Sequence, residues 1–183
     1  MRTRRVGAVV SALILASSTN GLAGQSATTW IAGGGLSLPV GDFNIYANDG
    51  PGLLAGIERS IGRHPTALRL DLSYGVNSDN TAIGFHETTR LFSVLGSVVY
   101  HFTGSRPHLY ALAGVGYFHR RFTSNDPDET PINDSHVAIQ VGEGAIVQVG
   151  SFKLFVEGRF VSSVGTGPFR FAPLIIGLRL GGD

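Results

Sequence analysis

The feature that most constrains this chain is an alternation of two kinds of side chain along eight segments. In "FKLFVEGRFV" (residues 152–161), the charged residues Lys153, Glu157 and Arg159 share one parity, whereas Phe152 and Val156 share the other. Successive residues of a β-strand point to opposite faces of its sheet, so this segment is predicted to be a strand with one apolar and one polar face. The same period-2 pattern recurs in segments 28–38, 52–60, 66–77, 88–103, 108–122, 136–149, 152–162 and 170–180.

The connections between these segments alternate between short and long. "SIGRHP", "TGSRP" and "GS" are short, whereas "PVGDFNIYANDGP", "SDNTAIGFHE", "TSNDPDETPINDS" and "SVGTGPF" are longer. In an up-and-down meander every second connection lies at the same end, which predicts tight turns at one end and large loops at the other. Eight strands also allow the sheet to close, which removes both edges. The predicted fold is all-β, an eight-stranded antiparallel up-and-down barrel.

This pattern of eight segments, short turns, long loops and a closing "FAPLIIGLRL" resembles the small outer-membrane β-barrel proteins of Gram-negative-type bacteria, the outer-membrane-protein A/X class, over about residues 28–180. The resemblance implies a transmembrane barrel located in the cell outer membrane. Its implied partners are outer-membrane lipid, lipopolysaccharide and the barrel-insertion machinery. Such barrels commonly end on an aromatic residue, whereas this chain ends "RLGGD".

Periodicity alone does not decide which face of the barrel points outward. A secreted lipocalin-like barrel, with its apolar face inside to hold a ligand, is the alternative. The polar face combines charges of both signs with small residues, which suits the narrow interior of an eight-stranded barrel. Aromatic residues near the strand ends are assigned to the apolar face, as interfacial girdles: Trp30, Tyr100, Phe102, Tyr110, Phe122 and Phe152. The membrane barrel is therefore favoured.

The N-terminus has the features of an export signal. Three arginines within the first five residues precede an apolar run over 6–16 and then small residues, which is the order of a secretory signal peptide over residues 1–24. Residues 25–183 are then the barrel domain. Without the signal, 11 basic and 13 acidic residues remain, and a slightly acidic chain of this kind is not expected to bind nucleic acid.

The predicted barrel interior contains three acidic and three basic residues: Glu58, Arg69, Asp71, Glu157, Arg159 and Arg179. The tight turn "SIGRHP" allows Glu58 to face Arg69 across neighbouring strands. An unpaired buried charge is costly, and a barrel of eight strands is too thin for a wide channel, so an ionic plug of the lumen is predicted. The alternative is a narrow porin-like channel for small ions.

Glu143 does not fit the alternation. Parity places it with Val141 and Ala145 on the apolar face, where a charge is penalised in a membrane. Gly142 and Gly144 flank it, so a β-bulge that turns the carboxylate inward is predicted.

Two histidines, His119 and His136, flank the acidic loop "SNDPDETPINDS", and parity assigns both to the inner face. In a symmetric hairpin they would meet at the outer rim as a metal-binding or pH-sensing pair. The acids of the loop match no EF-hand spacing, so a solvated surface loop is predicted there. No cofactor is expected.

A lipid A-modifying outer-membrane enzyme is the rival functional class, and it requires a serine with a histidine. The nearest arrangements are "HFT" from His101 and the pair Ser135-His136, and neither resembles the signature of the deacylases. The chain is therefore predicted not to be an enzyme. Its predicted role is structural or surface-interactive, and the sequence does not indicate an oligomeric state.

Overall fold

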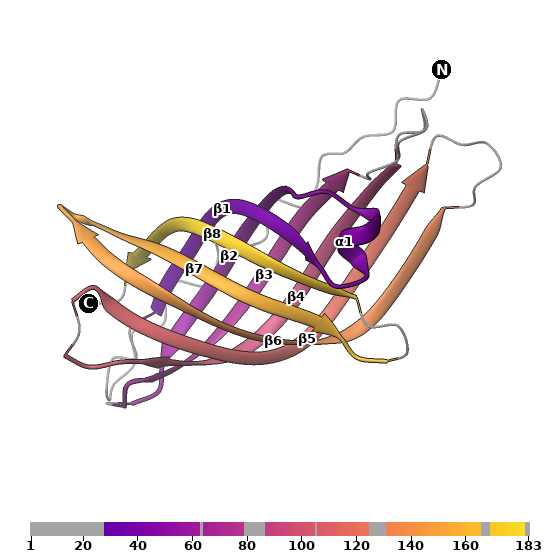
Figure 1. Ribbon diagram of the computed structural model, residues 1–183. Helices are drawn as coiled ribbons and strands as arrows, with labels where there is room; N and C mark the ends of the chain where they lie inside the picture. The colour runs from indigo at the N-terminus through magenta and orange to yellow at the C-terminus, as the bar shows by residue number, and fades with distance from the viewer. Residues whose placement is uncertain are drawn as a thin grey trace, which may run out of the picture.

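A computed structural model describes residues 28–62, 64–78, 87–104, 106–124, 131–165 and 169–181. Every strand in it is antiparallel to its neighbours, and β1 pairs with β8 to close the barrel (Figure 1). The strands are β1 (Thr28–Val40), β2 (Gly50–Ser60), β3 (Thr66–Ser78), β4 (Glu87–His101), β5 (His108–Ser124), β6 (Ile132–Val149), β7 (Phe152–Ser163) and β8 (Arg170–Gly181). The predicted eight-stranded fold is confirmed.

The connections divide the barrel into two ends. We call the end with the connections 61–65, 102–107 and 150–151 the turn end, and the opposite end the loop end. The connection at the loop end between β1 and β2 contains one helical turn, α1 (Phe43–Tyr46), which the sequence did not predict. No helix in the described ranges is long and apolar enough to cross a bilayer.

Strand β6 begins four residues earlier than the predicted segment 136–149. Its ladder with β5 continues to the pair Phe122 and Ile132. Arg120 Nε donates to Asp134 Oδ1 at 3.0 Å across this extension. The ion pair therefore lies within a long hairpin, in a stretch whose polar composition had suggested a loop.

The two faces of the strands differ as predicted. On β7, Phe152 is 58% exposed on the outer face, whereas Glu157 is fully buried and Arg159 is 5% exposed. Large aliphatic side chains such as Leu68 and Ile176 are likewise exposed on the outer face. A soluble barrel would bury its apolar face, so this inverted distribution is that of a barrel surrounded by lipid rather than of a lipocalin.

The predicted aromatic girdle requires a correction. Trp30, Tyr100 and Phe102 are exposed on the outer face, as is Phe152. Tyr110 instead points inward, where its hydroxyl donates to Glu157 Oε2 at 2.7 Å. Phe122 has the same parity on β5 and also faces inward, because it pairs with the buried Thr89 of β4. The two assignments were wrong because residue type was given more weight than parity.

The predicted β-bulge at Glu143 is also wrong. The β6 ladder runs without interruption, with Glu143 opposite Ala111 of β5 and Gly158 of β7, and the side chain is exposed on the outer face. Gly142 and Gly144 instead face the barrel interior, where a larger residue would not fit. A Cβ on Gly144 would lie 2.4 Å from the Tyr110 ring, and one on Gly142 would lie 2.7 Å from the Gly158 carbonyl oxygen.

Some predictions concern residues outside the described ranges. The signal peptide, residues 1–24, is one of them, and most of the acidic loop between β5 and β6 is another.

Candidate functional site

A cluster of four charged side chains crosses the middle of the barrel. Arg69 and Asp71 come from β3, and Glu157 and Arg159 come from β7. Arg69 Nη1 donates to Glu157 Oε2 at 2.7 Å, and Arg69 Nε donates to Asp71 Oδ1 at 2.8 Å. Arg159 Nε donates to Glu157 Oε1. We call these four residues the central cluster; none of their side chains is more than 2% exposed.

The alternation of the strands explains how the central cluster forms. Residues two apart on a strand share a face, so Arg69 and Asp71 both point into the lumen from β3, and Glu157 and Arg159 both do so from β7. The bases and acids of the two strands meet across the lumen, and the formal charge of the cluster is zero. Arg159 Nη2 lies 3.0 Å from Asp71 Oδ2, a contact with ion-pair distance but without hydrogen-bond geometry.

Neutral side chains complete the central cluster. Tyr110 donates to Glu157, and Gln140 Oε1 accepts from Arg159 Nη1 at 3.1 Å. Gln140 Nε2 donates in turn to Ser97 Oγ at 2.6 Å. Sequence reasoning did not select Gln140 or Tyr110, although their inward parity was available as a signal. These partners satisfy groups that the ion pairs alone would leave unpaired.

A second group of charges lies toward the turn end. Glu58 accepts hydrogen bonds from Arg179, with Nη1 at 3.2 Å from Oε2. His101 Nε2 lies 3.0 Å from Glu58 Oε1. Glu58 and Arg69 are directly opposite in the register of β2 and β3, as the sequence suggested. Each nevertheless pairs elsewhere, Glu58 with Arg179 and Arg69 with Glu157. The six charged residues selected from the sequence therefore lie in the lumen as two separate buried groups.

The loop end of the lumen is closed by apolar side chains, which the sequence analysis missed. This apolar seal consists of Phe43, Ala47, Leu91, Leu95, Phe118, Ala138, Val161, Phe169 and Phe171. Phe43 belongs to α1, and its ring centroid is 3.8 Å from that of Phe169. Phe118 packs at 5.5 Å from both Phe169 and Phe171. The helical turn thus contributes a side chain to the interior of the barrel.

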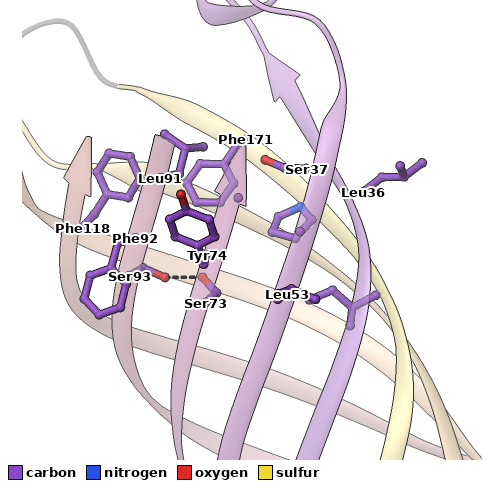
Figure 2. A pocket seen from close by; sticks show the side chains of 14 residues that line it. Leu36, Ser37, Leu53, Ser73, Tyr74, Leu91, Phe92, Ser93, Phe118 and Phe171 are labelled. Carbon is purple, nitrogen blue, oxygen red and sulfur yellow. Dashed lines mark hydrogen bonds between the residues drawn. The ribbon is translucent and has the colours of Figure 1, made fainter. Parts of the chain in front are cut away.

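A small cavity lies beneath the apolar seal. Its volume is about 20 Å³, and Ser37, Ser73 and Ser93 line it together with Phe118 and Phe171 (Figure 2). Ser73 and Ser93 are hydrogen-bonded to each other at 2.6 Å. A volume of this size is enough for about one water molecule, and it does not accommodate a lipid acyl chain.

The predicted inward histidine pair is wrong. His119 lies opposite Phe92 and Ser135 and faces outward, whereas His136 lies opposite Phe118 and faces inward. His119 Nδ1 is hydrogen-bonded to Ser135 Oγ at 2.8 Å, and His136 Nε2 lies 3.4 Å from Asp134 Oδ2. His119 pairs with Ser135, the residue before His136, and successive residues of a strand point to opposite faces, so the two histidines do not meet. No group of three metal-ligating side chains occurs in the described part of the chain.

No family model and no curated protein matches this chain. Solved structures do match its fold. A major outer membrane protein from Thermus thermophilus has a TM-score of 0.62 at 14% identity, covering 85% of this chain and 99% of that one. Ail, the attachment invasion locus protein of Yersinia pestis, has a TM-score of 0.56 at 13% identity, with the same coverage. Neisserial surface protein A has a TM-score of 0.52 at 17% identity, covering 84% of this chain and 94% of that one.

These similarities agree with the geometry of the barrel. A closed eight-stranded sheet with an apolar outer face and a polar, charged interior is typical of a small barrel that spans a lipid bilayer. The chain is a transmembrane β-barrel with the fold of the small eight-stranded outer-membrane proteins.

Proposed function

We propose that this protein is an integral outer-membrane barrel that conducts no ions and acts as a structural or surface-interaction protein. The observation that carries the proposal is the double closure of the lumen. The central cluster fills the middle of the barrel, and the apolar seal fills the loop end.

The energetics of the central cluster support a closed lumen. Moving Glu157 aside would break its contacts with Arg69, Arg159 and Tyr110. Breaking a buried ion pair costs about 3–5 kcal/mol, which corresponds to an open fraction of roughly 10⁻² to 10⁻⁴. The apolar seal would still block the path, because its aromatic side chains offer no ligands to an ion. A porin-like channel is therefore disfavoured relative to a plug.

The proposal includes no catalytic role. His119 and Ser135 are hydrogen-bonded, but no described carboxylate faces outward beside His119 to orient its ring. A serine is a weak nucleophile unless a well-oriented base activates it. The cavity under the seal is too small to hold an acyl chain. The larger opening of the lumen, about 450 Å³ at the turn end, is lined by the charged side chains of Glu58, Lys153 and Arg179, which do not suit an acyl chain.

Conductance in planar bilayers tests the proposal. The folded protein is expected to give no conductance steps at either polarity, under conditions in which a porin added to the same membrane gives them. Reproducible steps from the folded protein would contradict the closed lumen. Insertion is verified independently by heat-modifiable gel mobility, so that a silent membrane is not mistaken for a closed barrel.

The proposal also includes the partners that an outer-membrane barrel would have. The barrel-insertion machinery would place the chain in the membrane, and the outer face would contact outer-membrane lipid and lipopolysaccharide. The structure contributes the apolar outer face that such contacts require.

A further inference from the structure

The outer face of the barrel carries a polar patch at the loop end of β4, β5 and β6. Its five side chains occupy two adjacent rows of the sheet, and we call them the outer polar patch: Arg90, His119, Arg121, Asn133 and Ser135. In the first row Arg90 lies opposite Arg121, and Arg121 lies opposite Asn133. In the second row His119 lies between Phe92 and Ser135. Both arginines are exposed.

The outer polar patch lies at the level of lipid head groups. Tyr100, an exposed aromatic residue at the turn end of β4, is ten residues from Arg90 on the same face. At about 3.3 Å per residue and a strand tilt of about 40°, this separation spans about 25 Å along the membrane normal. That distance equals the height of the apolar band of outer-membrane barrels. Exposed aromatic residues adjoin the patch, as at a membrane interface: Tyr74, Phe92 and Tyr117.

The two arginines of the patch give it a positive charge that an anion would balance. Like charges directly opposite each other on neighbouring strands are destabilising, and Arg90 and Arg121 form such a pair. Within the described strands, the only acid that faces outward is Glu143, ten residues from Asn133 along β6. Asp134 faces inward and pairs with Arg120. The two guanidinium groups thus have no carboxylate of the described chain beside them.

Guanidinium groups bind phosphate oxygens in a bidentate manner, which makes a phosphate the ligand that best matches the arginine pair. The other members of the patch, Asn133, His119 and Ser135, are polar side chains that can donate and accept hydrogen bonds. Asn133 adjoins Arg121, and His119, which is hydrogen-bonded to Ser135, adjoins Phe92. Such groups suit hydroxyls next to a phosphate, as on a phosphorylated sugar.

We propose that the outer polar patch binds the phosphorylated sugar head group of a lipid A-type glycolipid in the outer leaflet. This proposal rests on the proposed outer-membrane location and deepens it, because it assigns a lipid partner to particular residues. Arg90 and Arg121 hold the phosphate, Asn133, His119 and Ser135 contact the sugar, and the acyl chains lie along the apolar outer face below the patch.

The barrel also contains a matched control. Arg59 is an exposed arginine on the outer face at the turn end, in the row next to Trp30. It lies at the opposite edge of the apolar band, where it meets the other leaflet. A variant at Arg59 therefore removes the same charge from the same face without touching the outer polar patch.

The test uses the folded protein in phosphatidylcholine nanodiscs and measures retention of lipid by native mass spectrometry. The probes are diphosphoryl lipid A, its dephosphorylated form and phosphatidylglycerol. The double variant Arg90→Gln/Arg121→Gln is expected to weaken binding of diphosphoryl lipid A by about tenfold or more, since each arginine contributes charge-assisted hydrogen bonds. Arg59→Gln is expected to bind diphosphoryl lipid A as tightly as the wild type does. The affinity of Arg90→Lys/Arg121→Lys is expected to lie between those of the wild type and the double glutamine variant.

Three results would overturn the proposal. They are an unchanged affinity in the double variant, equal binding of dephosphorylated lipid A, and binding of phosphatidylglycerol as tight as that of diphosphoryl lipid A. Heat-modifiable mobility shows that each variant is folded. If these binding tests fail, the proposal of a closed lumen is unaffected. If the protein conducts ions in planar bilayers, the proposal of a lipid site is unaffected. The two proposals can therefore be refuted separately.

Discussion

Replacing Glu157 by glutamine removes one negative charge from the central cluster while keeping the shape of the side chain. In the wild-type barrel this carboxylate accepts from Arg69 Nη1 at 2.7 Å, from Tyr110 at 2.7 Å and from Arg159 Nε. Glutamine retains one acceptor oxygen and adds two donors that face guanidinium groups. The variant also leaves the cluster with two arginines and only Asp71 to balance them.

The expected cost of Glu157→Gln is about 3–5 kcal/mol in the free energy of unfolding, because one partner of a buried ion pair is lost. Asp134→Asn is the matched control. Asp134 also pairs with an arginine, but its side chain is 26% exposed, so the expected cost is only about 0–1 kcal/mol. Both variants remove one carboxylate charge beside an arginine, so the difference between their free energies of unfolding reports the effect of burial.

A double-mutant cycle sharpens this prediction. Arg159→Met in the Glu157→Gln background restores a neutral cluster of Arg69 and Asp71. The double variant is expected to be more stable than the sum of the two single effects by about 1–3 kcal/mol. Urea unfolding in bilayers, followed by the fluorescence of Trp30, the only tryptophan, measures all four proteins. An unchanged midpoint for Glu157→Gln, or strict additivity in the cycle, would refute the buried ionic network as a source of stability.

Four further variants test other features of the barrel. Glu143→Val is expected to stabilise the folded protein by up to about 2 kcal/mol in urea unfolding, because it removes an acid from the apolar outer face. Gly144→Ala is expected to cost about 1–3 kcal/mol in the same assay, since the added Cβ would lie 2.4 Å from the Tyr110 ring, whereas Gly158→Ala meets open space and is expected to be nearly neutral. Phe118→Ala is expected to cost about 3–5 kcal/mol and still to give no conductance, because the central cluster remains; conductance steps in this variant would mean that the apolar seal alone closes the lumen.

The fold was predictable because parity is a strong local signal. Strands β3 and β7 each carry acids and bases on one face and large apolar residues on the other, so their ends and faces follow directly from the sequence. The faces of β5 were the exception, because its two parities were assigned the wrong way round: His119 was placed inward, and it faces outward. Tyr110 and Phe122 were placed with the outer aromatics although their positions on β5 are inward.

The interior was predictable only in part, because contacts across the lumen depend on three-dimensional closure. The six charged residues were selected correctly as inward residues, but their partners come from opposite walls: Arg69 meets Glu157, 88 residues away in the chain. The apolar seal was missed for a different reason. It combines inward residues of several strands with Phe43 of α1, a helical turn that carries no periodicity of its own.

Glu143 shows the limit of a local rule. Two flanking glycines are typical of a β-bulge, yet here they make room for Tyr110 and for the Arg159 side chain on the inner face. The acid stays on the outer face because the ladders on both sides of β6 are regular, and a register slip would turn the whole strand over.

We infer above all that the apolar parity of each strand faces lipid and the charged parity faces the lumen. Because the chain has no cysteine, single cysteines along β7 test this orientation directly. Cysteines at Leu154, Val156 and Phe160 are labelled with a fluorescent maleimide in urea before the protein is folded into bilayers, and brominated lipid is expected to quench the attached dye in the folded protein. Cysteines at Phe155 and Val161, both buried, are expected to react only after unfolding in urea. Reaction of either buried cysteine in the folded protein, or the absence of quenching by brominated lipid at the first set, would contradict this orientation of the barrel wall.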